Sequence, residues 1–112
     1  MKRTSDITRN FEISFNQYAT FLDLATSDTY QEKVTADWSS KVTNVEFVVL
    51  YNSHSSNDAL VKINNGDEIV VPAGMMRSFG IDNVTKIEYK SKSAGNPATL
   101  TIEVYGRSDV DI

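Results

Sequence analysis

Apolar and polar residues alternate with a period of two through much of the second half of the chain. Residues 84–90 and 98–104 both show this alternation, and the segment between them carries the turn-forming sequence Gly95-Asn96-Pro97. A period of two is typical of β-strands that bury one face and expose the other. These segments therefore predict two strands joined by an exposed loop. The apolar side of the last strand comprises Ala98, Leu100, Ile102 and Val104.

The sequence Asn64-Asn65-Gly66 predicts a β-hairpin between two apolar runs. A two-residue loop would mix apolar and charged side chains on each face of this hairpin. A three-residue loop, with Gly66 in the left-handed conformation, pairs Val61 with Ile69 instead. We prefer the second register because it keeps one face of the hairpin apolar. That face comprises Ala59, Val61, Ile63, Ile69 and Val71.

The most apolar run, residues 43–51, has apolar residues on both of its alternating faces. Its β-branched residues and Phe47 predict a strand. We assign Phe47 and its face to the core, which leaves Val48 and Leu50 on the opposite face. On the hairpin, Leu60 and Val70 likewise face away from the core. These residues define a candidate protein-interface patch that comprises Val48, Leu50, Leu60 and Val70.

An exposed apolar patch is the usual mark of a partner site. On this interpretation, Leu50→Asp is expected to leave the isolated domain folded while abolishing its incorporation into a larger particle. The alternative is that a helix or loop from the first third of the chain covers these residues within one subunit. In that case the patch belongs to the interior of the domain.

The first third of the chain is compatible with strands or with helices. Residues 11–15 alternate as in a strand, whereas Tyr18, Phe21, Leu22 and Ala25 recur at helical spacing, and Thr29 with Glu32 matches a helical capping box. We favour strands. The chain is therefore interpreted as all-β: an antiparallel β-sandwich, jelly-roll-like, with about eight short strands. It is expected to form a single domain over residues 1–112, in which residues 1–10 form a polar N-terminal arm.

Composition excludes several classes of function. The chain has 112 residues, no cysteine and a formal net charge of -4, with acidic and basic residues mixed along its length. Without cysteine it cannot form disulfides, zinc ribbons or iron–sulfur clusters. Without a basic stripe it is not expected to bind nucleic acid. No apolar run approaches the ~20 residues of a membrane span, and none follows the N-terminus as in a secretory leader. We therefore expect no membrane partner and no export.

Residues capable of catalysis or metal binding are scattered. His54 is the single histidine and lies in a Ser/Asn-rich stretch, which is typical of a solvated loop. Asp67 and Glu68 are adjacent, so on a strand they point to opposite faces and cannot act as an acid/base pair. Asp109 and Asp111 supply too few oxygens for a calcium site. The sequence therefore predicts no cofactor, no metal and no enzymatic activity.

Three segments resemble a known protein family. The segment Ile63-Asn64-Asn65-Gly66-Asp67-Glu68-Ile69-Val70-Val71-Pro72-Ala73-Gly74 resembles a hairpin and corner common in small β-sandwich structural proteins of tailed bacteriophages. Residues 86–92 and 100–106, which lead to a closing strand, are similar to the same proteins. The resemblance covers the second half of the chain and consists of turn and strand patterns.

The resemblance implies a structural component of a virion assembled in the host cytoplasm. The most direct role is an auxiliary or decoration capsid protein; a head-fibre, collar or tail accessory subunit is also implied. Its partners would be the major capsid protein or neighbouring virion subunits, and it would form a homo-oligomer. The family supplies no catalytic residue. The alternative function is a carbohydrate- or host-receptor-binding module, with Tyr105 and Trp38 as aromatic platforms for a sugar.

Overall fold

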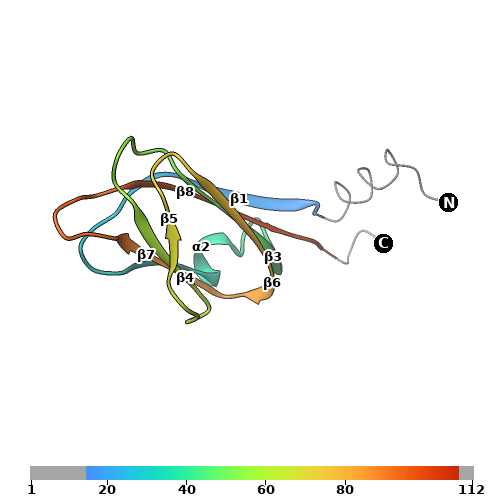
Figure 1. The fold of residues 1–112 in the computed structure, drawn as a ribbon. Helices are drawn as coiled ribbons and strands as arrows, with labels where there is room; N and C mark the ends of the chain where they lie inside the picture. The colour runs from blue at the N-terminus through green and yellow to red at the C-terminus, as the bar shows by residue number, and fades with distance from the viewer. Residues whose placement is uncertain (1–14, 109–112) are drawn as a thin grey trace.

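The protein is an antiparallel β-sandwich of two four-stranded sheets (Figure 1). The computed structural model describes residues 15–108, and within this range the chain forms eight strands and one short helix. Sheet A has the strand order β1-β8-β3-β6, and sheet B has the order β2-β7-β4-β5. The elements are β1 (Gln17–Ala25), β2 (Gln31–Val34), α2 (Thr35–Trp38), β3 (Val45–Asn52), β4 (Ala59–Ile63), β5 (Ile69–Val71), β6 (Met76–Val84), β7 (Lys86–Ser91) and β8 (Thr99–Gly106).

This strand order is that of a jelly roll. The first half of the chain pairs antiparallel with the second half as one long ribbon, with β1 on β8, β2 on β7, β3 on β6 and β4 on β5. The ribbon then wraps so that β8 also pairs with β3 and β7 pairs with β4. Wrapping divides the ribbon into two sheets that face each other across one core. The expected fold class is therefore confirmed.

The core lies between the sheets and is filled by the apolar side of the alternating strands. Ala98, Leu100, Ile102 and Val104 are all buried, as the alternation in residues 98–104 predicts. The predicted apolar face of the β4–β5 hairpin also lies inward, with Val61 paired to Ile69. The fully buried side chains of β3 are Val45, Val48, Leu50 and Asn52.

The sequence-based assignment of the two faces of β3 is wrong. Val48 and Leu50 are 0% exposed and lie in the core, so they are not part of a surface patch. Phe47, by contrast, lies on the outer face of sheet A. The reason is a β-bulge between Val45 and Phe47, which lets Val45 face inward together with Val48. With apolar residues on both faces, the pattern alone does not reveal which face is buried.

The turn of the β4–β5 hairpin differs in detail from the predicted one. In the β4–β5 hairpin, Asn64 and Asn65 adopt left-handed conformations with φ of 52° and 62°, whereas Gly66 does not. The Gly66 N–H donates to the Ile63 carbonyl at 2.9 Å and closes the turn. Asn tolerates positive φ because its short polar side chain bonds locally, so the predicted register is formed without glycine in that role.

The first third of the described chain consists mainly of strands, as favoured. Thr29 and Glu32 do not cap a helix; Glu32 lies within β2. The one-turn helix α2 begins after Val34, whose N–H donates to the Asp37 carboxylate at 2.7 Å. This turn carries Trp38 into the core, where its side chain is 2% exposed. The expected N-terminal arm, residues 1–10, lies outside the described residues.

Candidate protein-interaction surface

The outer face of sheet A carries three rows of side chains that cross all four strands. Each row consists of residues that pair with one another across neighbouring strands. Leu22 is placed in row 3 because it lies two residues after Thr20, the β1 residue of row 2. Row 1 consists of Tyr18, Tyr105, Phe47 and Gly80; row 2 of Thr20, Glu103, Val49 and Ser78; and row 3 of Leu22, Thr101, Tyr51 and Met76.

Large apolar side chains on these rows are exposed. Tyr18 is 63% exposed, Leu22 71%, Tyr51 39% and Met76 62%. A strand that buries only one face normally places polar residues on the other, but β3 is apolar on both. Exposed apolar side chains gathered on one sheet face make it a candidate surface for contact with another protein.

Among the residues of the three rows, Glu103 alone is charged. Its carboxylate accepts a hydrogen bond from the Tyr105 hydroxyl at 2.9 Å. Burial, together with the bond to Glu103 and its negative charge, raises the pKa of Tyr105 above its ordinary value. The hydroxyl therefore remains a donor at physiological pH, and the glutamate is held against the sheet.

Aromatic rings cluster at one end of this face. The Phe15 ring stacks on that of Phe47 with centroids 5.6 Å apart, and Tyr18 stacks on Tyr105 at 6.0 Å. Phe47 meets Tyr105 edge-on at 6.4 Å. Such pairs each contribute about 0.5–1.5 kcal/mol beyond their burial, so the rings form a stable platform.

The outer face of sheet B is different, because charged side chains cover it and bind one another. The Tyr30 ring lies within 4.9 Å of the Lys62 ammonium and 5.2 Å of the Lys90 ammonium. Its hydroxyl donates to Glu68 at 2.6 Å, and Lys86 pairs with Glu88 at 3.8 Å. These interactions pair several of the charges of this face within one chain, so its surface is polar where that of sheet A is apolar.

Tyr30 gives the domain an expected sensitivity to alkali. Burial first, and then the hydrogen bond to Glu68 and the charges of Glu68 and Glu88, raise the pKa of Tyr30 above its ordinary value of 10.0. Above pH 10 the unfolded chain loses this proton while the folded chain keeps it, so the free energy of unfolding falls as pH rises. Urea titrations between pH 9 and 11 should show a shallower loss for Tyr30→Phe than for the wild type. Equal slopes would contradict the assignment.

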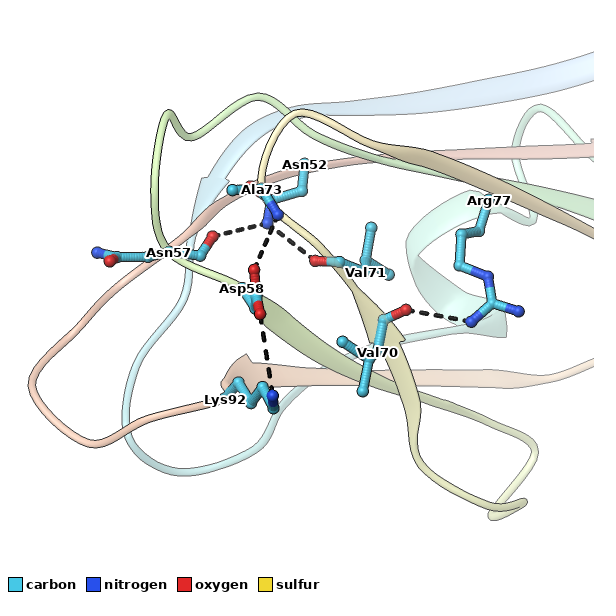
Figure 2. Close-up of polar contacts among 8 residues, drawn as sticks. All are labelled: Asn52, Asn57, Asp58, Val70, Val71, Ala73, Arg77 and Lys92. Atoms are coloured by element: carbon cyan, nitrogen blue, oxygen red, sulfur yellow. Dashed lines mark hydrogen bonds and ion pairs between the residues drawn. The ribbon is translucent and has the colours of Figure 1, made fainter.

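The loops at one end of the sandwich are fixed by a buried asparagine (Figure 2). The Asn52 side chain is 0% exposed. Its amide donates to the carbonyls of Asn57 at 2.8 Å and Val71 at 3.0 Å, and its oxygen accepts from the His54 N–H at 3.0 Å. Asn52 thus joins the β3–β4 loop to the corner that follows β5.

Asp58 extends this network to the neighbouring loops. Its carboxylate accepts from the Ala73 N–H at 2.9 Å and lies 3.9 Å from the Lys92 ammonium, as Figure 2 shows. On the other side of the corner, Arg77 of β6 donates to the Val70 carbonyl of β5 at 3.2 Å and bridges the two sheets. All these groups bind protein atoms, so the network positions loops.

The predicted interface patch is not formed as expected. Val48 and Leu50 lie in the core, whereas Leu60 and Val70 are cross-strand neighbours on the outer face of sheet B. Leu60 is 9% exposed and Val70 is half-buried, so this pair presents little surface. A contact of Leu60 and Val70 with a partner remains a prediction.

The sequence pattern did not predict the positions of several residues of the surface and the core. Met75 and Met76 are 53% and 62% exposed, although methionine is more often a core residue. Trp38, expected as a sugar platform, is buried. The three rows of sheet A draw on strands far apart in the chain, so only the pairing of β1, β8, β3 and β6 brings them together. The signal available in the sequence was the two-sided apolar character of residues 45–51.

The described residues do not form a metal-binding cluster. Within residues 15–108, no three His, Asp or Glu side chains converge to hold a metal ion, and each buried polar side-chain atom has a hydrogen-bond partner. The Nδ1 atom of His54 accepts hydrogen bonds from the backbone N–H groups of Ser56 and Asn57, so this side chain stabilises its own loop. Asp109 and Asp111 lie outside the described range. No helix in the described part of the chain is long and apolar enough to cross a membrane.

Comparison with known proteins does not assign a family. No protein-family model matches the chain, and no curated protein sequence matches it significantly. Among solved structures, a protein from Neisseria meningitidis is similar with a TM-score of 0.48 and 13% identity, over 81% of this chain and 76% of that one. A structure reported for DMSP lyases has a TM-score of 0.40 and 11% identity, over 85% of this chain and 39% of that one. Similarity this weak carries no inference about activity.

Proposed function

We propose that this domain is a non-catalytic structural subunit of a larger protein assembly, and that the assembly is the virion of a tailed bacteriophage. The observation that carries the first part is the outer face of sheet A, which exposes large apolar side chains on β1, β3 and β6. Such a face has a favourable free energy of burial, at about 25 cal/mol per Å² of apolar area removed from water. Contact with other subunits is therefore the function that this surface supports.

The second part rests on the resemblance of the hairpin, the corner and the closing strand to small phage structural proteins. The corner is held rigidly: the Gly74 N–H donates to the Asn52 carbonyl at 2.8 Å, and the Met75 N–H to the Pro72 carbonyl at 3.0 Å. A rigid corner beside an apolar sheet face suits a decoration or accessory subunit that docks without rearrangement. The partners would be the major capsid protein or neighbouring virion subunits, met in the host cytoplasm during assembly.

The test is the composition of purified particles. Particles released from cells that carry this gene should contain the chain in many copies, as measured by mass spectrometry and located by electron microscopy. The double variant Leu22→Asp/Tyr51→Asp should fold but be depleted from particles at least tenfold. Glu32→Ala, on the charged outer face of sheet B, is the matched control and should be incorporated normally. Particles that lack the wild-type chain would refute the virion role.

Sugar binding is the second candidate, and the exposed Tyr18 ring is the observation that favours it. An exposed tyrosine can stack on the apolar face of a sugar. A glycan array on the purified protein tests this candidate. Saturable binding that Tyr18→Ala abolishes would support it over a purely structural role.

A further inference from the structure

We propose that the occupant of the outer face of sheet A is a second copy of this chain, packed face to face about a two-fold axis along the strands between β8 and β3. The inference rests on the proposed function, because it names the partner of the same surface. A closed two-fold contact uses one patch on both copies, so that patch must be complementary to itself. The chosen axis places β1 of one copy opposite β6 of the other, and β8 opposite β3. The arrangement of the three rows can be tested against this requirement.

Charge favours a second copy and this axis. Two chains with a formal net charge of -4 each repel one another unless their contact surface is nearly uncharged. The outer face of sheet A meets this condition, since Glu103 is the only charged residue of its rows. The chosen axis sets Glu103 opposite Val49 of the second copy. An axis across the strands would set Glu103 opposite itself, which places like charges together at a cost.

Side-chain size is also complementary about this axis. Row 3 sets Leu22, 71% exposed, opposite Met76 of the second copy, 62% exposed, so these two exposed apolar side chains cover each other. Row 1 sets Tyr18, 63% exposed, opposite Gly80. Gly80 leaves a depression in the sheet, because a Cβ built on it would meet only the Phe47 ring, at 3.8 Å. At this position a large side chain thus opposes the smallest one, as in the packing of two sheets within one sandwich.

The size of the face suits a stable dimer. Four strands spaced about 4.8 Å apart, each contributing about 27 Å of length, present a flat projection of roughly 500 Å². The accessible surface of the side chains on such a face is larger than its projection. A stable interface buries about 800 Å² per partner, so this face is of the required order.

Cysteine cross-linking tests both the dimer and its axis, because the chain has no cysteine of its own. The axis brings Thr20 of β1 opposite Ser78 of β6 in the second copy, across the roughly 10 Å that separates two packed sheets, which is too far for a direct disulfide. A short bifunctional thiol reagent bridges cysteine side chains that point toward each other across this gap. Within one chain the same two residues are separated by two strands, or about 14 Å, and their side chains point the same way, so the reagent does not join them. With this reagent, Thr20→Cys/Ser78→Cys should form a covalent dimer on a denaturing gel, and each single variant should remain a single chain.

The wild-type protein provides the second readout. Light scattering should give the mass of two chains, and Tyr51→Asp should weaken dimerisation at least tenfold while leaving the circular dichroism spectrum unchanged. A wild-type monomer at high concentration would overturn the inference, as would efficient cross-linking of Thr20→Cys alone, which an axis across the strands would produce. Incorporation of a monomeric chain into particles would separate the two proposals, since it would leave the structural role standing.

Discussion

Leu50→Asp is expected to abolish folding of the domain, whereas Tyr51→Asp, one residue along the same strand, is expected to leave it folded. Leu50 is 0% exposed in the core, and full burial of a leucine side chain contributes about 1.5–3 kcal/mol. The aspartate adds the cost of an unpaired buried carboxylate. The sum, more than about 4 kcal/mol, is a large part of the stability of an ordinary domain.

Tyr51 is the matched control because it lies on the outer face of the same strand and is 39% exposed. Its replacement should cost about 1 kcal/mol, mostly through lower strand propensity. Urea unfolding followed by the fluorescence of Trp38, the single tryptophan and 2% exposed, measures both variants. A folded Leu50→Asp domain would show that the two faces of β3 are assigned wrongly here.

Asn52→Asp is expected to lower the free energy of unfolding by about 3–5 kcal/mol. The change replaces an amide that donates to the carbonyls of Asn57 and Val71 with an oxygen that repels both. The introduced carboxylate is also buried without a cation. Asn57→Asp is the control of identical chemistry, because the Asn57 amide donates one bond, to the Pro97 carbonyl, and this bond is exposed; the change should cost about 1 kcal/mol.

The pH dependence of Asn52→Asp distinguishes charge from lost hydrogen bonds. Burial disfavours the charged carboxylate, so the folded variant should hold a proton more tightly than the unfolded chain, whose carboxyl has a pKa of about 3.9. The difference between variant and wild type should therefore shrink as pH falls from neutral toward that value. Urea titrations at several pH values provide the measurement. A difference independent of pH would indicate that the lost donors dominate.

The alternating segments show what sequence alone can predict. In residues 98–104 polar and apolar residues alternate strictly, so the pattern identified both the strand and its buried face. In residues 45–51 both faces are apolar and a bulge changes their phase, so the strand was predicted correctly and its orientation was not. The hairpin register followed from keeping one face apolar, but the left-handed asparagines were not anticipated.

The candidate surface could not be derived in the same way. Its rows join residues as distant as Tyr18 and Tyr105, and their adjacency depends on the wrapping of the whole ribbon. The two-sided apolar strand indicated that a surface exists, without showing which residues form it. Conversely, Leu60 and Val70 were correctly placed on the outer face of the hairpin, but Leu60 is 9% exposed and Val70 is half-buried, so little of the pair is accessible.

The position of β8 between β1 and β3 has a consequence for biosynthesis. β8 is the last of the eight described strands to be synthesised, yet it is a central strand of sheet A and supplies hydrogen-bond partners to both of its neighbours. Until β8 has been made, β1 lacks the strand with which it pairs, and the core lacks Leu100, Ile102 and Val104. The eight described strands therefore cannot complete the sandwich in stages from the N-terminus, and folding at the slow rate of domains dominated by long-range contacts is the expected course.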